Sequence, residues 1–139
     1  MIIGHGVDLV EHDSFSKLVL REQAFLERCF TKAEISEGRG NADSVRWFAS
    51  RFAAKEAVMK ALGTGWTQGI AWHEIVTSTC LGGGLGVHLA GTAALIAEQK
   101  KILQWFLTIS HTQHFSIASI IATDQVNHQR DCPELTGGV

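Results

Sequence analysis

The sequence lacks long apolar segments and a cysteine framework. No apolar run approaches the roughly 18 residues that span a bilayer, and no basic stretch precedes an apolar one at the start, so we expect neither a membrane partner nor a cleaved signal. The three cysteines, Cys29, Cys80 and Cys132, are widely spaced and form no Cys-x-x-Cys pair. This pattern favours reduced thiols in a cytoplasmic protein over a disulfide scaffold or a zinc knuckle.

Basic charge is also scarce. The formal net charge is -2, whereas a general nucleic-acid binder is usually clearly basic, so we expect no nucleic-acid partner. The basic residues are unevenly distributed, because beyond Lys60 the chain holds only Lys100, Lys101 and Arg130. An anionic ligand or partner is therefore expected to meet the first half of the chain.

The composition that remains fits one small folded domain. The chain has 139 residues, of which 45% are hydrophobic and 19% charged, and we expect a single domain over residues 1–123. Residues 124–139 are polar, hold the only proline and are expected to form a flexible tail. A chain this short buries a modest share of its surface, so self-association would add stability.

Periodicity and turn residues predict helices early and strands late. This order indicates an α+β fold in which a small antiparallel sheet packs against helices. Thr31 and Glu34 form a capping-box pattern, Ser44 is the predicted N-cap of the longest helix, and Gly63 follows that helix. The predicted strands are 2–10, 70–78, 85–90, 103–110 and 115–122, the predicted helices are 13–28, a short one from 31, 44–62 and 91–101, and 38–41 is a predicted loop.

Asp8 is a carboxylate inside the first apolar strand. Because a strand alternates its faces, Asp8 points to the same side as Gly6 and Val10. An ionised carboxylate on a half-buried face needs a cation or strong donors. Gly4 and Gly6 leave that face open to a ligand or to another backbone segment. Without a ligand, Asp8 would simply pair with a surface Lys or Arg.

The segment from Arg51 to Lys60 is a helix with several charged side chains. Glu56 and Lys60 are four residues apart, so they share one face and could form an ordinary exposed ion pair worth about 0.3–0.5 kcal/mol. Alternatively, Glu56 joins Asp8 in binding a hard cation, and Lys60 neutralises phosphate oxygens of a ligand. Mg²⁺ fits this alternative because it takes one or two carboxylates together with substrate phosphates.

Two polar turns could contact the same ligand. Gly63–Gly65 is either a plain helix cap or a ligand-facing turn, and it is not a P-loop because it follows a helix and lacks the Gly-Lys-Ser/Thr ending. Ser110–Thr112 lies at a predicted hairpin tip, where hydroxyl and imidazole donors suit either a phosphate contact or an ordinary polar turn. His111 and His114 lack a third ligand at zinc spacing, so we expect no zinc.

Lys17, Arg21 and Arg28 recur at spacings of four and seven. They would form one basic stripe if the helix over 13–28 were continuous. Such a stripe is either an ordinary solvated face or a docking surface for an acidic protein, whose charges would mainly set the encounter rate and the salt dependence.

Together these segments resemble the holo-[acyl-carrier-protein] synthase family, the short 4′-phosphopantetheinyl transferases. The family opens with Ile-Ile-Gly-x-Gly-x-Asp-Ile-Val-Glu, and residues 2–11 read Ile-Ile-Gly-His-Gly-Val-Asp-Leu-Val-Glu. Its central helix reads Arg-Phe-Ala-Ala-Lys-Glu-Ala-x-x-Lys-Ala-Leu-Gly-Thr-Gly, which residues 51–65 match throughout. Its closing hairpin carries Ser-His-Thr or Ser-His-Asp, as at Ser110–Thr112, and the resemblance covers about residues 1–123.

The resemblance implies that the 4′-phosphopantetheine arm of coenzyme A passes to a serine of apo acyl carrier protein, as in fatty acid biosynthesis, and that 3′,5′-ADP leaves. It implies that Asp8 and Glu56 hold Mg²⁺ on the coenzyme A pyrophosphate. Glu56 would also remove the serine proton, directly or through water, and Lys60 would stabilise the pyrophosphate or leaving group. Family members are homotrimers with sites at subunit interfaces. The residues expected to bind coenzyme A are Arg51, Lys60, Gly63, Thr64, Gly65, Ser110, His111 and Thr112, and those expected to dock the carrier protein are Lys17, Arg21 and Arg28.

The sequence departs from the family pattern at two places. Members usually carry an arginine near position 14 that helps to dock the carrier protein, where this chain has Ser14. The loop before the middle strand commonly has Gly-Lys-Pro, where this chain has a glycine-rich segment over 82–86. Two rival interpretations stay open: a coenzyme A or nucleotide-binding module without catalysis, and an oligomeric scaffold.

Overall fold

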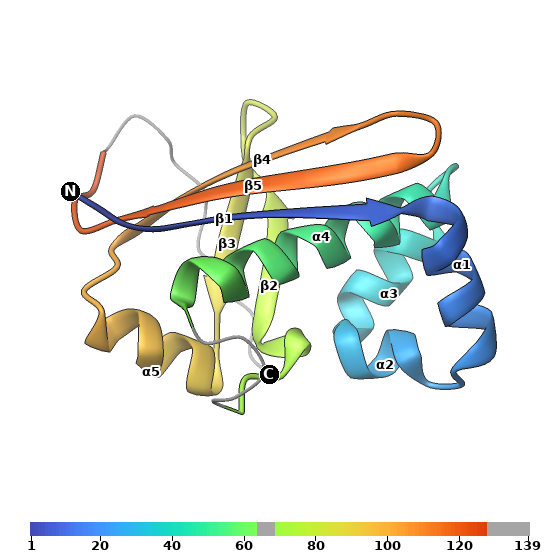
Figure 1. The fold of residues 1–139 in the computed structure, drawn as a ribbon, viewed down its shortest axis with the longest axis horizontal. Coiled ribbons are helices and arrows are strands. Elements are labelled where there is room, and N and C mark those ends of the chain that lie inside the picture. Colours follow the sequence, from blue (N-terminus) through green and yellow to red (C-terminus); the bar gives the residue numbers. More distant parts are fainter. Residues whose placement is uncertain (64–68, 128–139) are drawn as a thin grey trace.

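The computed structural model describes residues 1–63 and 69–127. Five antiparallel strands form one sheet in the order β1-β5-β4-β3-β2, so the first strand pairs with the last and the predicted α+β fold is confirmed. Figure 1 shows α4 running along β1 and β5, with α1 to α3 at one end of the molecule and α5 at the other. The elements are β1 (Ile2–Glu11), α1 (His12–Arg21), α2 (Phe25–Cys29), α3 (Lys32–Arg39), α4 (Ser44–Leu62), the 3₁₀ turn η2 (Trp72–Glu74), β2 (Ile75–Thr79), β3 (Leu85–Leu89), α5 (Gly91–Gln99), β4 (Gln104–His111) and β5 (Phe115–Thr123).

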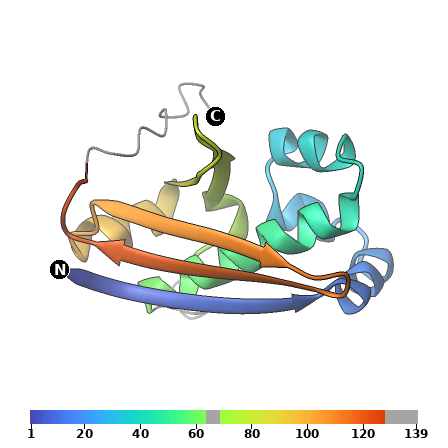
Figure 2. The ribbon, with the colours of Figure 1, turned by 90° about the horizontal axis from the view of Figure 1, so that it is seen from above.

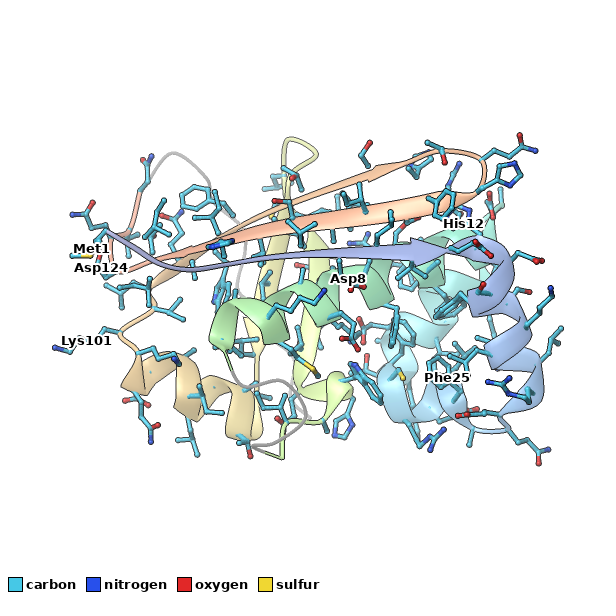
Figure 3. The ribbon with its side chains drawn as sticks, viewed as in Figure 1. Met1, Asp8, His12, Phe25, Lys101 and Asp124 are labelled. Carbon is cyan, nitrogen blue, oxygen red and sulfur yellow. The ribbon has the colours of Figure 1, made fainter. Side chains whose placement is uncertain are left out.

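The packing of β1 on α4 depends on two glycines. A Cβ atom at Gly4 would lie 2.2 Å from the carbonyl oxygen of Ala61, and one at Gly6 would lie 2.0 Å from that of Ala57. No side chain fits into so short a gap, so the helix backbone itself occupies the face that these glycines leave open. The strand therefore lies directly on α4, and Figure 3 shows Asp8 where β1 passes that helix.

The core has two parts that meet at α4. Toward the sheet, the small side chains of Ala53, Ala57 and Ala61 on α4 pack in one cluster with Ala118 and Ile120 of β5. Toward α1 and α2, four rings lie within 6.4 Å of at least one other, measured between centroids. We call these four residues the aromatic cluster: Phe15, Phe25, Phe52 and Trp72.

The predicted continuous helix over 13–28 is wrong. The first helix ends at Arg21, and the chain turns through Ala24, which has a φ of 68°, before α2 begins at Phe25. The turn brings the Phe25 ring to 6.0 Å from that of Phe15, measured between centroids. Burial of Phe25 beside Phe15 therefore accompanies the break, which a periodicity along one straight helix could not predict.

Three smaller expectations also need correction. The stretch predicted as a strand over 70–78 contains η2, and β2 begins only at Ile75. The expected loop over 38–41 begins late, because α3 continues to Arg39. The N-cap of α4 is Asp43 and not Ser44, since the Asp43 carboxylate accepts a hydrogen bond from the backbone N–H of Arg46 at 3.1 Å. The capping box of Thr31 and Glu34 is confirmed.

The expectation of three reduced thiols is wrong for Cys80. Cys29 is free and buried, whereas the structure places Cys80 in a disulfide. Cys80 begins the turn between β2 and β3, where its backbone N–H donates to Gly84 O at 2.7 Å. Wide spacing along the chain therefore did not exclude a disulfide in space.

The described residues bear on two more features, membrane-spanning helices and the predicted C-terminal tail. Within 1–63 and 69–127, none of the helices combines the length and apolarity needed to cross a membrane. Most of the predicted tail, residues 128–139, lies outside the described residues, so the domain boundary and the flexible tail stay predictions. Figure 2 shows the described part from above, with β1, β5 and β4 side by side.

Candidate active site

An ion pair between Asp8 and Lys60 connects β1 to α4. The side chain of Asp8 is 17% exposed, and its Oδ1 lies 3.0 Å from Lys60 Nζ. The same ammonium donates to the carbonyl oxygen of Val7 at 2.8 Å. Lys60 therefore contacts the strand β1. The spacing of four residues along the helix had predicted an ion pair with Glu56 instead. The Lys60 side chain is 53% exposed, so this cation is also open to an anionic ligand.

Glu56 lies one helical turn before Lys60 and is half-buried. Its Oε1 accepts a hydrogen bond from the indole N–H of Trp72 at 2.7 Å. Burial raises the pKa of the Glu56 carboxyl, the Trp72 hydrogen bond lowers it, and the negative charge of Asp8 raises it again. The last effect means that the two carboxylates lie within electrostatic range of each other, and their sharing of one cation stays a prediction.

This pair of carboxylates fits a hard divalent cation that brings ligands of its own. In the part of the chain that the structure describes, no group of three or more His, Cys, Asp or Glu side chains is placed to hold a metal. Mg²⁺ does not need such a group, because it usually keeps several waters and binds one or two carboxylates plus substrate phosphates. Asp8 and Glu56, with Lys60 beside them, therefore suit Mg²⁺ carried on a phosphorylated ligand better than a structural zinc.

Lys55 is a buried structural cation. Its side chain is 0% exposed and donates to Glu34 Oε1 at 2.9 Å, to the carbonyl oxygen of Trp72 at 3.2 Å, and to that of Ile75. Burial lowers the pKa of the Lys55 ammonium, and the negative charge of Glu34 opposes that shift. Lys55 therefore ties α3, η2 and β2 to α4 at the residue that precedes Glu56.

Arg51 lies on the buried side of the same helix. Its guanidinium lies 5.2 Å from the centroid of the Trp47 ring, and its Nη1 donates to Thr77 Oγ1 at 3.2 Å. Burial is the main reason that the pKa of Arg51 is lowered, but the group remains a strong cation. Within one protomer Arg51 is thus engaged with α4 and β2, and its predicted contact with coenzyme A stays a prediction.

The two turns predicted to bind one ligand lie far apart within a single protomer. Gly63 is exposed, caps α4 with a φ of 71° and comes two residues after Ala61, which packs on Gly4, while Thr64 and Gly65 lie outside the described residues. Ser110–Thr112 is exposed at the far end of the sheet, near Glu11. Gly4 and Glu11 are separated by about 20 Å of extended strand. Figures 1 and 2 both place the end of α4 and the tip of the β4–β5 hairpin at opposite ends of the molecule.

The predicted docking residues are exposed but do not form a stripe on one helix. Lys17 and Arg21 lie on α1, and Arg28 lies on α2 beyond the turn. Lys17 Nζ is 3.0 Å from an oxygen of Asp13, and Arg28 Nη2 is 2.7 Å from one of Glu22. The single stripe is therefore wrong, and two of its three cations already have acidic neighbours.

Sequence reasoning missed Trp72. Its segment was expected to be a strand, in which successive side chains point to opposite faces and nothing indicates a contact with Glu56. The 3₁₀ turn η2 instead carries the indole N–H to Glu56. The sequence carried no signal for this contact, because the turn that brings the indole to Glu56 is formed only in the folded chain.

Comparison with known proteins identifies the family. Residues 4–120 match the model of the 4'-phosphopantetheinyl transferase superfamily. The holo-[acyl-carrier-protein] synthase of Koribacter versatilis is 39% identical over 125 residues, which cover 89% of this chain and 100% of that protein. That of Desulforudis audaxviator is 40% identical over 131 residues, covering 94% and 99%.

Solved structures agree with the sequence comparison. The holo-[acyl-carrier-protein] synthase of Neisseria meningitidis superposes with a TM-score of 0.81 at 29% identity, covering 88% of this chain and 99% of that one. The Bacillus anthracis enzyme, solved in complex with CoA (3',5'-ADP), gives 0.71 at 27% identity, covering 88% and 96%. The chain therefore belongs to the 4′-phosphopantetheinyl transferase superfamily, and within it to the holo-[acyl-carrier-protein] synthase family.

Proposed function

We propose that the protein transfers the 4′-phosphopantetheine arm of coenzyme A to a serine of apo acyl carrier protein and releases 3′,5′-ADP, with Mg²⁺ as cofactor. The observation that carries this proposal is the ion pair of Asp8 with Lys60, one helical turn from the half-buried Glu56, in a chain of this family. A relative from Helicobacter pylori, 28% identical, was solved in complex with coenzyme A, which supports this molecule as the donor. A role in fatty acid biosynthesis and a cytoplasmic location are part of the same proposal.

The chain's own residues have distinct parts in this reaction. Asp8 and Glu56 would hold Mg²⁺, which supplies neutralisation of the charge on the coenzyme A pyrophosphate when it is bound. The serine oxygen forms a bond to the β-phosphorus, and the bond from that phosphorus to the oxygen of 3′,5′-ADP breaks. Glu56 would accept the serine proton, directly or through water. Lys60, exposed beside Asp8, stabilises the charge on the departing phosphate.

A homotrimer is the second part of the proposal. The outer face of β1 and β5 carries a group of exposed apolar side chains, and Leu9 lies directly opposite Ile117 across the β1–β5 pair. Exposed apolar patches of this kind often mark contacts between proteins. Ser110 lies opposite Ile117 on β4, so a copy that covers this face also brings its hairpin tip close to another copy. The exposed apolar residues of this face are Val7, Leu9, Phe115, Ile117 and Ile121.

Self-association would also resolve the separation of the two turns. If the hairpin tip of one copy approached Gly63 of a neighbour, Ser110–Thr112 and Gly63–Gly65 could contact one molecule of coenzyme A. Light scattering after size exclusion should then give a mass of three chains, and Leu9→Lys should lower it. A monomer at micromolar concentration would contradict this part of the proposal without affecting the chemistry assigned to Asp8 and Glu56.

The transferase itself is tested by mass spectrometry. Incubation with coenzyme A, Mg²⁺ and an apo acyl carrier protein should add one phosphopantetheine group to the carrier. Asp8→Asn and Glu56→Gln should each reduce the rate by about 100-fold or more, because each removes a carboxylate that would hold the charge-neutralising Mg²⁺. Glu98→Gln, which changes an exposed carboxylate on α5, is the matched control.

Three outcomes separate the alternatives. Wild-type rates in either site variant at limiting Mg²⁺ would contradict the metal assignment. Binding of coenzyme A without transfer would favour the non-catalytic module. Absence of any affinity for coenzyme A would favour the oligomeric scaffold.

A further inference from the structure

We propose that Trp72 is a positioning residue that fixes the Glu56 carboxylate in the orientation needed to bind the metal. This inference rests on the proposed function. Its starting observation is the hydrogen bond of 2.7 Å from Trp72 Nε1 to Glu56 Oε1, made between an indole of η2 and a half-buried carboxylate of α4. Outer donors of this kind commonly set the orientation of carboxylates that bind metals.

The backbone of Trp72 is fixed independently of that hydrogen bond. The ammonium of Lys55 donates to the Trp72 carbonyl oxygen at 3.2 Å and is itself held by Glu34 at 2.9 Å. Lys55 and Glu56 are consecutive in α4, so neighbouring helix residues bind the two ends of one tryptophan. The turn is therefore tied to the helix at the position where its indole is needed.

The ring of Trp72 is fixed as well. Its centroid lies 5.7 Å from that of Phe52 and 6.4 Å from that of Phe25, both with tilted planes. Figure 3 shows Phe25 at α2 next to α1, and the centroid of its ring lies 5.7 Å from that of Phe52 on α4. Because both the backbone and the ring of Trp72 are held, the indole N–H has a set direction, and the carboxylate of Glu56 takes its orientation from it.

The indole is also chemically suited to this task. It is a neutral donor without an acceptor, so it binds Oε1 without adding the positive charge that would compete with a metal ion. The second oxygen, Oε2, then remains as the atom for a cation shared with Asp8. A lysine at the same place would instead repel the cation. The aromatic cluster thereby connects the docking helices α1 and α2 to a carboxylate of the active site.

The first test compares two tryptophan variants. Trp72→Phe keeps an aromatic ring in the cluster and removes only the N–H donor, while Trp105→Phe makes the same change on β4, remote from Glu56. Binding of Mn²⁺, used as a paramagnetic substitute for Mg²⁺, is measured by electron paramagnetic resonance in the presence of coenzyme A. We expect about tenfold weaker binding for Trp72→Phe and no change for Trp105→Phe. Thermal unfolding of both variants reports any purely structural effect.

A result within about two-fold of the wild type for Mn²⁺ binding by Trp72→Phe would overturn the proposal, since loss of a needed outer donor has a larger effect. A lower melting temperature with unchanged Mn²⁺ binding would equally overturn it, because Trp72 would then be only a packing residue. Failure of the wild type to transfer phosphopantetheine would instead overturn the proposed function. The two failures are thus distinguishable.

A second measurement needs no stable Trp72 variant. The sequence holds four tryptophans, so the indole N–H resonance of Trp72 in a ¹⁵N spectrum can be assigned by elimination with Trp47→Phe, Trp66→Phe and Trp105→Phe. We expect this resonance to shift when Mg²⁺ and coenzyme A are added, and to shift in metal-free Glu56→Gln. The resonance of Trp105 should move in neither case. A Trp72 resonance that ignores both changes would refute the role assigned to its N–H.

Discussion

The two sides of α4 are built in different ways and have different tasks. Toward β1 the contact consists of glycine against helix backbone, and it leaves no room for a single methyl group at Gly6. Toward α1 and α2 it consists of large rings, and beside them lies the buried pair of Lys55 and Glu34. The first side sets how close strand and helix come, and hence how close Asp8 and Glu56 lie. The second side sets the direction of the Glu56 carboxylate through Trp72.

The comparison shows that the two sides of one helix can control different properties of a site. One side sets the distance between its carboxylates, and the other sets the orientation of one of them. Close packing of two backbones tolerates no added methyl group. Neither backbone can move away without breaking hydrogen bonds of the sheet or the helix. Ring packing tolerates changes of shape better, but the ion pair within it does not tolerate the loss of one partner.

The largest effect should come from the buried ion pair. Lys55→Met leaves Glu34 buried without its cation, and the free energy of unfolding should fall by about 3–5 kcal/mol. Urea unfolding measures this loss. The double variant Lys55→Met with Glu34→Gln should recover part of it, because no uncompensated charge remains. Equal losses in the single and double variants would mean that the pair matters through the carbonyl contacts of Lys55 and not through its charge.

The next effect should come from the glycine contact. Gly6→Ala adds a methyl group 2.0 Å from Ala57 O, so strand and helix must separate, at a cost of about 3 kcal/mol in the free energy of unfolding. Gly84→Ala is the matched control, since a Cβ there meets nothing within 4 Å. Gly6→Ala should also weaken Mg²⁺ binding, because the carboxylates move apart. Unfolding free energies that agree for both variants would show that the contact is less tight than described.

A smaller effect concerns pH. Burial raises the pKa of Glu56 in the metal-free folded protein above its value in the unfolded chain, and Asp8 adds to that shift. The folded state then binds the proton more tightly, so the contribution of Glu56 to stability falls as the pH rises through the raised pKa and recovers on acidification. Urea unfolding of wild type and Glu56→Gln between about pH 4.5 and 7 should show the wild type gaining relative stability toward the acidic end. A gain toward the neutral end would contradict the raised pKa.

The smallest effect should come from the docking charges. Arg21→Glu combined with Arg28→Glu should raise the KM for carrier protein several-fold at low salt and leave the KM for coenzyme A unchanged, as expected for rim charges. Arg21 should account for more of the effect than Arg28, which already binds Glu22. Lys101→Glu, at the opposite end of the molecule, is the control. Equal changes for both substrates would remove the docking hypothesis.

Much of this organisation could be predicted from the sequence. Alternation in β1, the capping box at Thr31 and the long run of α4 gave the sheet and its main helix, because each depends on residues close together in the chain. The family motif predicted that Asp8 and the charged residues of α4 belong to one site, and the structure pairs Asp8 with Lys60 of that helix. The break before Phe25 did not, because it depends on rings that only the folded chain brings together. Trp72 was missed for the same reason, since its partner is set by a turn and not by its spacing.

Lys55 illustrates a further limit. Charged residues at helical spacing usually indicate a solvated face, and Arg51 and Lys55 have that spacing. Both are nevertheless buried, because α3 and β2 supply oxygen acceptors from outside the helix. Patterns within one segment cannot report acceptors that arrive from another.

The distance between Gly63 and the hairpin tip has a consequence for inheritance and for assays. If different copies contribute these two turns to one reaction centre, a chain damaged at its tip and a chain damaged at Asp8 can restore some intact centres when they assemble together. Activity would then reappear when two inactive variants are mixed and reassembled. In a cell that carries both alleles, each variant would partly compensate for the defect of the other.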